Sequence, residues 1–371
     1  MAKHLFYIIC MCLLLFSCSS KKSKDKDNTI QELPTIQLQG EYLKCDSDIW
    51  GMKIDFIDEN QFLIEELSQN KLYAIYELDG NSLRKKGSFL TKGNGAWEVV
   101  NPSYQVTDSS LFIANYSGTI SKVYKIRKEY PFDKDKWEVV DMPLNHNCLF
   151  FPNFVMFNDS ICIATGGELT DNKILSAINF KRNKVEAINY TFPGINVATY
   201  VKPADFLVYC DAELAKHPSL SKFVYTCRLG RFIEILEMDG THLSKRIPLC
   251  ADYPVYKASN DRRVIDDRCL RGAVTKVTEN YIYCLMTPYT HGEALKENLY
   301  KGLPNYFSDI LYVFNWDGKL LHKYTLDMPV CSFCIDRNDK CMFASTMKGE
   351  DFVIRKSLIP QHYYKIFFLS T

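Results

Sequence analysis

The sequence reads Asp108-Ser109-Ser110-Leu111-Phe112-Ile113 where its repeating unit is clearest, a polar turn followed at once by a short apolar strand. Six copies of this unit occur along the chain. Their first apolar residues are Phe62, Leu111, Ile161, Phe223, Tyr281 and Cys341, at intervals of 49, 50, 62, 58 and 60 residues. A unit that returns at such intervals is typical of repeat architectures, in which each copy is one structural module.

Asp-Gly dipeptides provide a second marker of the repeat, at Asp79-Gly80, Asp239-Gly240 and Asp317-Gly318. This dipeptide supplies the positive φ angles of a tight hairpin turn. Gly80 and Gly240 follow the first apolar residue of their copies by 18 and 17 residues, whereas Gly318 follows Tyr281 by 37. We therefore predict an insertion of about 20 residues in the fifth unit. Residues 288–307 are the candidate, with a helix over 291–300.

Turn, strand, loop, strand, turn and strand in 50 to 60 residues describe the four-stranded blade of a β-propeller. We predict an all-β fold, a six-bladed β-propeller of four-stranded antiparallel blades, as one domain over residues 38–371. Two β-sandwiches are the alternative, but sandwiches do not repeat at a fixed interval. The last blade is closed either by residues 35–44 or by residues 363–369.

The N-terminus has the composition of an export signal. Lys3 and His4 precede an apolar run at 5–16, which is shorter than the about 20 residues of a membrane-spanning helix. Leu15-Phe16-Ser17-Cys18 resembles the lipobox of bacterial lipoproteins, in which the cysteine is lipidated. We predict a lipoprotein signal peptide at 1–17, membrane attachment by lipid on Cys18, and a short disordered tether at 18–37. An ordinary signal peptide with a chance cysteine is the alternative.

A family resemblance extends from about residue 38 to the end of the chain. The stretch Gly93-Asn94-Gly95-Ala96-Trp97-Glu98-Val99-Val100-Asn101-Pro102 resembles the loop after blade one in TolB-like, NHL-like six-bladed propeller lipoproteins. Phe314-Asn315-Trp316-Asp317-Gly318 and Val330-Cys331-Ser332-Phe333 are similar to a hairpin and the next strand of that family. The resemblance implies the fold and export to the cell envelope, as an outer-membrane lipoprotein facing the periplasm or the surface. It implies no activity.

Eleven cysteines follow Cys18, an odd number without regular spacing, which does not indicate a disulfide framework. Several stand in apolar runs, and we expect most thiols, including Cys162, Cys284 and Cys341, to be buried and reduced. Cys331 and Cys334 form a C-x-x-C pattern in a predicted strand. Residues i and i+3 of a strand face opposite sides, so packing is favoured over redox chemistry.

Catalytic and metal-binding motifs are not found in the sequence. The seven histidines lack metal-ligand spacing, and we predict no catalytic residue, no metal and no cofactor. The inner strands that the repeat identifies, at 53–57, 104–107, 154–157, 273–277 and 330–335, offer only Asp55 as an acid. This scarcity favours binding over catalysis. The near balance of 45 basic and 44 acidic residues argues against a nucleic-acid partner.

Two long loops, at 253–272 and 289–306, form the candidate binding surface, because long loops in compact domains are often functional. They belong to one blade and should project from the same face. The candidate contact residues are Tyr253, Tyr256, Arg262, Arg263, Arg268, Tyr289, His291, Tyr300 and Tyr306. Arginine and tyrosine are enriched in contact surfaces. Solvated loops with internal ion pairs are the alternative.

We therefore expect a monomeric, exported binding module whose propeller face docks a protein or a glycan. The alternatives are a propeller-type hydrolase or lyase acting on a carbohydrate or an ester, and a structural component of an outer-membrane assembly. Asp159-Ser160-Ile161 resembles an O-glycosylation site of some anaerobic Gram-negative bacteria, which makes Ser160 a candidate for modification.

Overall fold

The structure is a computed structural model. It describes residues 33–66, 70–93, 95, 97–116, 120–142, 148–168, 172–193, 203–259, 262–301, 308–349 and 351–360. The chain divides into two compact units, Met1–Pro34 and Thr35–Thr371, and the fold described below is that of the second. Cys18 and the predicted signal peptide lie outside the described residues. The first strand begins at Thr35, so residues 35–37 of the predicted tether belong to a strand.

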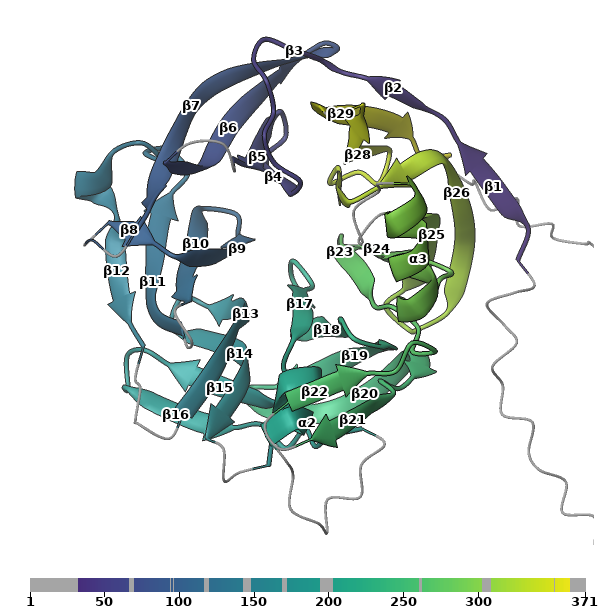
Figure 1. The fold of residues 1–371 in the computed structure, drawn as a ribbon. Coiled ribbons are helices and arrows are strands. Elements are labelled where there is room, and N and C mark those ends of the chain that lie inside the picture. Colours follow the sequence, from purple (N-terminus) through teal and green to yellow (C-terminus); the bar gives the residue numbers. More distant parts are fainter. Residues whose placement is uncertain are drawn as a thin grey trace, which may run out of the picture. The chain divides into compact units, whose positions relative to one another are not determined.

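Six antiparallel sheets surround a central axis as the blades of a propeller (Figure 1). The first three blades run from the inside outward in chain order. Their strands are β4 (Ile54–Asp58), β5 (Gln61–Glu65), β6 (Lys71–Asp79) and β7 (Ser82–Lys92); β9 (Asn101–Val106), β10 (Ser110–Tyr116), β11 (Ile120–Arg127) and β12 (Glu138–Asp141); and β13 (Cys148–Asn158), β14 (Ile161–Glu168), β15 (Leu175–Asn179) and β16 (Lys184–Ala187). The short strand β8 (Glu98–Val99) pairs with β7, and a 3₁₀ helix, η1 (Lys134–Lys136), precedes β12.

Blades four and five follow the same order, and blade six borrows its outer strand from the N-terminus. Their strands are β17 (Ala212–Lys216), β18 (Lys222–Cys227), β19 (Arg231–Asp239) and β20 (His242–Asp252); β23 (Ala273–Val277), β24 (Tyr281–Met286), β25 (Ser308–Asn315) and β26 (Leu320–Val330); and β27 (Ser332–Ile335), β28 (Cys341–Lys348), β29 (Asp351–Leu358) and β2 (Gly40–Tyr42). The predicted all-β fold of six four-stranded blades is confirmed.

Each copy of the sequence repeat forms the second strand of a blade, from β5 to β28. These strands read as continuous apolar runs because both of their faces are covered by neighbouring blades. In β5, Phe62, Leu63 and Ile64 are all buried. The Asp-Gly turns connect the third and fourth strands of blades one, four and five, and their glycines have φ angles of 60°, 58° and 86°.

The N-terminal segment closes the ring and reaches beyond the closing blade. β1 (Thr35–Leu38) pairs in parallel with β26 of blade five, β2 pairs antiparallel with β29 of blade six, and β3 (Lys44–Cys45) pairs in parallel with β7 of blade one. Of the two predicted alternatives, the structure therefore uses residues 35–44. Residues 363–369 lie outside the described part of the chain.

A buried arginine fixes the closing strand. The guanidinium of Arg355 on β29 donates two hydrogen bonds of 2.6 Å to the carboxylate of Asp327 and another to the carbonyl of Gly40. It also lies 4.8 Å from the ring centre of Tyr42. A planar guanidinium with several donors suits this arrangement of one carboxylate, one carbonyl and one aromatic ring.

Ten described cysteines are free thiols, and eight of them are buried, whereas Cys45 is exposed. Cys162 and Cys284 are fully buried, as predicted, whereas Cys341 is only partly buried. Cys334 packs in the apolar cluster between blades six and one, while the Cys331 sulfur contacts the hydroxyl of Ser345 at 3.0 Å. The two residues of the C-x-x-C pattern therefore have separate packing roles.

Candidate binding face

A cavity of about 410 Å³ lies where the inner strands meet around the axis. All six inner strands contribute side chains to it, among them Asp55 on β4, Tyr104 on β9 and Asn153 on β13. Several lining residues, including Lys53 and Arg271, stand just before an inner strand begins. The cavity therefore opens on the face where the chain enters the inner strands.

Asp55 of blade one is paired with a lysine of blade five. Lys276 on β23 donates from Nζ to Asp55 Oδ2 at 2.5 Å. Burial acts to lower the pKa of the Lys276 ammonium, but the charge of Asp55 and its hydrogen bond outweigh burial, and the pKa is raised. Lys276 is therefore charged at neutral pH.

Glu213 on β17 is a second acid in the cavity. Its carboxylate accepts from Arg228 Nη2 at 3.3 Å and from the backbone N–H of Thr275 at 3.1 Å. The prediction that Asp55 is the only acid on the inner strands is therefore wrong. β17 reads Ala-Glu-Leu-Ala-Lys, a composition that favours helix, and it lies in the longest interval between repeat copies, so the pattern did not reveal it.

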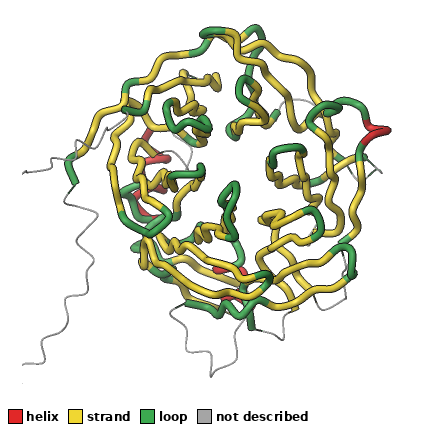
Figure 2. Tube along the Cα trace, turned by 180° about the vertical axis from the view of Figure 1, so that it is seen from behind, coloured by secondary structure: helices red, strands yellow, loops and turns green. Residues whose placement is uncertain are grey.

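The two predicted loops lie side by side on one face, as expected. The first contains a hairpin of β21 (Tyr256–Ser259) and β22 (Arg262–Ile265), and the second contains α3 (His291–Lys301). The N–H of His291 donates to the carbonyl of Cys269, and that of Gly292 donates to the carbonyl of Asp267, both at 2.9 Å. In Figure 1 α3 lies in front of the strands of blade five, and in the view from behind (Figure 2) it lies behind them.

Helix α3 forms where the insertion was predicted, and its start has a clear local cause. The hydroxyl of Thr290 accepts from the N–H of Glu293 at 3.2 Å, and the N–H of Thr290 donates to the Glu293 carboxylate at 2.9 Å. This reciprocal pair is a capping box, which satisfies two backbone donors of the first turn.

A second helix, α2 (Pro203–Tyr209), was not predicted. It precedes β17 and contacts the hairpin through Asp205, whose carboxylate accepts a hydrogen bond from the hydroxyl of Tyr256. Tyr256, predicted as a contact residue, therefore anchors the hairpin to α2 rather than facing a partner. We call α2, the β21–β22 hairpin and α3, with the chain at 253–255, 266–270 and 288–290, the wall.

Arg268 also has an internal role. It donates to the two carboxylate oxygens of Asp266 at 2.9 and 3.0 Å, while its side chain remains largely exposed. This bond holds the pKa of the Asp266 carboxyl well below its usual range. Arg268 thus follows the alternative reading of a solvated loop with an internal ion pair.

Of the other predicted contact residues, some have described side chains and others have only a described backbone. Tyr253 and Tyr289 are exposed on the wall. His291 is half-buried, and burial and the charge of Arg271 lower the pKa of its imidazole. The backbones of Arg262 and Arg263 lie in β22 and that of Tyr300 lies in α3, but their side chains are outside the described part, as is all of Tyr306. Ser160 lies in the turn between β13 and β14, away from the wall.

Five of the exposed large apolar side chains belong to the wall. They are Tyr253, Val255, Val264, Tyr289 and Leu295, of which Val264 is 58% and Leu295 is 54% exposed. The prediction included the two tyrosines but missed the three aliphatic residues, because nothing in the sequence separates an exposed valine or leucine from one in the core. Contiguous exposed apolar patches are typical of interaction sites, whereas single exposed apolar side chains are common on any surface.

The wall and the cavity are continuous through the chain. Arg271 and Gly272, which end the first loop, and Thr287 and Ser308, which flank the insertion, all line the cavity. The backbone of Arg271 also bonds to that of Tyr289 at 3.4 Å. The wall therefore rises from the rim of the cavity, on the face where the cavity opens.

Fold and cavity together define a six-bladed β-propeller with a cavity that opens at one end of its axis. The family model described as TolB-like 6-blade propeller-like matches residues 49–338, and the chain belongs to this family. Both sequence stretches that carried the predicted resemblance, at 93–102 and 314–333, lie within the matched range. A search of curated proteins found no match. Among the described residues, none of the helices combines the length and the apolar character required to cross a membrane.

Proposed function

We propose that this protein is an exported binding module that captures a protein partner on its wall and cavity face. The observation that carries the proposal is the group of exposed apolar side chains on the wall, rising from the rim of a cavity of about 410 Å³. Apolar patches next to a concave site are typical of recognition surfaces. Aliphatic residues such as Val264 and Leu295 favour a protein over a glycan, which offers mostly hydroxyl groups.

The cavity itself favours binding over the activity of a hydrolase or a lyase. A general acid or base has to exchange a proton with a substrate. Asp55 and Glu213 each accept a hydrogen bond from a cation and from a backbone N–H instead. In the described lining of the cavity, both carboxylates are therefore engaged in fixed pairs.

The test is site-specific crosslinking in cells that produce the protein. A photo-crosslinking residue at position 295 should yield one defined protein adduct, identified by mass spectrometry. The purified partner should then bind the double variant Val264→Ser, Leu295→Ser at least tenfold more weakly than the native chain. The control variant Val139→Ser, Leu220→Ser removes two exposed apolar side chains elsewhere and should bind normally. Equal affinity of the wall variant and the native chain would refute the proposal.

Export and lipid attachment at Cys18 belong to the same proposal. Propellers of the TolB-like family are typically periplasmic or envelope proteins, and the N-terminal sequence has the form of a lipobox. The mature chain should begin at Cys18 and carry acyl groups. Cys18→Ala should release the protein from membranes or leave it unprocessed, and an unmodified N-terminus at Ser19 or beyond in mass spectrometry would contradict the anchor.

O-glycosylation at Ser160 is a separate part of this proposal. Ser160 lies in a turn whose backbone is fixed by Asn158, because the Asn158 side chain accepts from the N–H groups of Ser160 and Ile161, both at 2.9 Å. This turn is partly exposed and distant from the wall. Intact-mass measurement should show an added glycan on the native chain that Ser160→Ala removes. The same mass for both proteins would rule the modification out.

A further inference from the structure

Two ion pairs of the cavity hold carboxylates that a ligand can still reach. Asp55 is paired with Lys276 at 2.5 Å, and Glu213 is paired with Arg228 at 3.3 Å. The side chains of Asp55 and Glu213 nevertheless remain 26% and 24% exposed, and both line the cavity. An ionised carboxylate can accept about four hydrogen bonds, and the bonds described above occupy only part of this capacity. The cavity therefore offers fixed acceptors to the hydroxyl groups of a ligand.

The other two cations of the lining also have partners in the chain. Lys53 Nζ lies 3.8 Å from Glu65 Oε1, and Arg271 has an interaction of its own. A charged ligand would have to compete with these pairs, and a pair broken in a partly buried site leaves an uncompensated charge behind. An uncharged ligand leaves every pair in place. The lining therefore favours a neutral molecule.

Asn153 supplies a donor that lacks an acceptor. It follows Pro152, which has no N–H, and the pairing of β13 with β14 is interrupted between Phe150 and Phe154. Such an irregularity re-aims a side chain. Nδ2 of Asn153 is buried and has no hydrogen-bond partner among the described residues, while the residue itself lines the cavity. A buried donor of this kind costs free energy, unless a ligand or ordered water supplies an acceptor.

Apolar side chains complete the lining. Tyr104, Phe154, Leu214 and Val274 all line the cavity, one from each of blades two to five. A sugar ring has hydroxyl groups around its edge, each of them both a donor and an acceptor, and apolar C–H groups on its faces. Small-ligand sites combine the same elements, an apolar lining with a few fixed polar groups, in volumes of roughly 300–1,000 Å³. The cavity of about 410 Å³ lies in this range.

We infer that the central cavity binds an uncharged sugar residue, either as a free sugar or as the end of a glycan. Its hydroxyl groups donate to Asp55 and Glu213 and accept from Asn153, which line the cavity from blades one, four and three. The inference goes beyond the proposed function, which rests on the exposed apolar side chains of the wall.

Isothermal titration of the full chain with D-glucose, D-galactose and D-mannose at millimolar concentrations tests the inference. At least one of these neutral hexoses should bind, and added salt should change its affinity little, because no ion pair with the ligand forms. The matching uronate carries one carboxylate in addition and should bind at least tenfold more weakly. The methyl α- and β-glycosides of the same hexose identify the source: binding of either glycoside indicates the end of a glycan, and loss of both indicates a free sugar.

Variants locate the binding in the cavity. Asn153→Ala should weaken the hexose at least tenfold while the midpoint of thermal unfolding changes little, because Nδ2 has no partner among the described residues to lose. Glu213→Gln keeps one acceptor oxygen and should weaken the hexose about threefold. Asn60→Ala, at an exposed asparagine in the turn before β5, is the matched control and should bind normally.

Three results would overturn the inference: no binding of any of the three hexoses, a uronate that binds as tightly as its neutral counterpart, or native affinity in both cavity variants. Glu213 is partly exposed, so its variant keeps the test valid even if Asn153→Ala does not fold.

The proposed function and this inference fail separately. Hexose binding without any crosslinked partner at position 295 would leave the sugar site standing and remove the docking role. A partner that binds the wall, combined with no binding of a neutral hexose, would do the reverse.

Discussion

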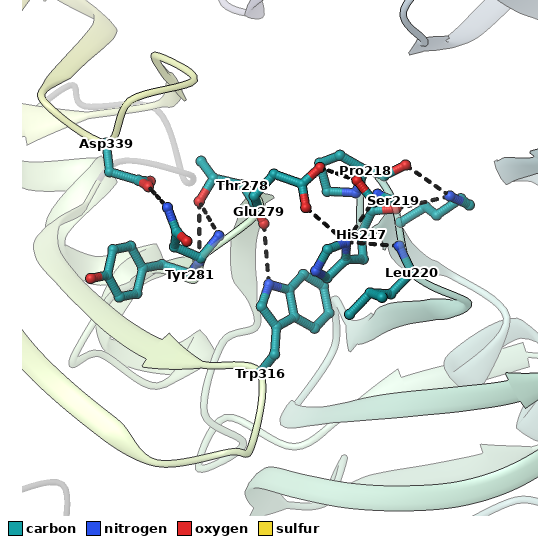
Figure 3. Close-up of polar contacts among 11 residues, drawn as sticks. His217, Pro218, Ser219, Leu220, Thr278, Glu279, Tyr281, Trp316 and Asp339 are labelled. Carbon is teal, nitrogen blue, oxygen red and sulfur yellow. Dashed lines mark hydrogen bonds and ion pairs between the residues drawn. The ribbon is translucent and has the colours of Figure 1, made fainter.

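The two ends of blade five differ in what their polar and apolar groups do. At one end, tight turns join blade five to its neighbours through fixed hydrogen bonds (Figure 3). At the other end lie the two loops of the wall, whose apolar side chains remain exposed. The first arrangement is complete within the chain. The second leaves apolar side chains exposed, so the difference separates an end that holds the ring together from the end on which we propose binding.

The tight end is built around His217 and Trp316. His217 is buried in the turn after β17, and its Nδ1 accepts from the N–H groups of Ser219 and Leu220 at 3.1 and 3.0 Å. Its ring centre lies 4.6 Å from that of Trp316, whose indole N–H donates to the carbonyl of Thr278 at 3.1 Å. Blades four and five are therefore joined by an aromatic contact and satisfied hydrogen bonds.

Acidic side chains extend these contacts to both neighbouring blades. Glu279 of blade five bonds to the hydroxyl of Ser219 in blade four and lies 3.6 Å from His217 Nδ1. On the other side, the Asn280 amide donates to Asp339 of blade six at 2.9 Å. In Figure 3 these side chains form one continuous group between the turns.

The largest expected effect comes from removing the indole at the tight end. Trp316→Ala should lower the free energy of unfolding by about 3–5 kcal/mol, for two reasons. The substitution leaves a void beside His217, and it removes the donor that hydrogen-bonds to the carbonyl of Thr278. Chemical denaturation measures this loss. Trp50→Ala, at an exposed tryptophan, is the matched control and should change stability by less than about 1 kcal/mol. Similar losses in both variants would break the contrast between the two ends.

A smaller and local effect is expected at the wall. Tyr256→Phe removes the hydroxyl bonded to Asp205 and should reduce the stability of the hairpin by about 1.5–3 kcal/mol, the usual range for a hydrogen bond to a charged group. Hydrogen exchange over 256–265 should accelerate while global unfolding changes little. Tyr289→Phe is the control on the same wall. A global loss of stability from Tyr256→Phe would show that the wall is part of the folded core.

Acid should weaken the tight end through His217. Burial lowers the pKa of its imidazole in the folded state, despite the opposing charge of Glu279 and with small contributions from Lys216 and Lys222. As the pH falls, His217 therefore takes up a proton in the unfolded chain before it does so in the folded protein. The contribution of neutral His217 to the free energy of unfolding is complete above about pH 6.5 and is lost as the pH falls toward the folded pKa. Between pH 7 and 5, the native chain should lose more stability than His217→Gln. If the free energy of unfolding fell equally with pH in the two proteins, this prediction would be contradicted.

The smallest effect is expected for an apolar residue of the wall. Leu295→Ser should leave the free energy of unfolding within about 0.5 kcal/mol of the native value, because Leu295 is mostly exposed in the folded protein. Its effect on partner binding should be larger than its effect on stability. A loss of several kcal/mol would mean that α3 buries this side chain against the blades, which would remove it from the binding face.

Local patterns predicted the blades but not the cavity. The repeat identified all six second strands, and the Asp-Gly turns and α3 formed where they were expected, since each depends on neighbouring residues in the chain. The cavity brings together residues from Met52 to Ser332, and no short sequence pattern encodes that arrangement. Glu213 was missed because its strand has a helical composition, and α2 because its seven residues are too few for a clear period.

The closing segment also sets an order of events for a chain that grows from its N-terminus. β1 and β2 are made first, yet their partners β26 and β29 come almost at the end of the chain. Gly40, for example, pairs with Ser357. β3 finds β7 much sooner, since Lys44 pairs with Ser82. During synthesis, β1 and β2 therefore have no partner strands until blades five and six are made. Non-local pairing of this kind is intrinsically slow. A chain stopped before β29 would leave β2 without its partner strand, as an open edge available to a neighbouring copy.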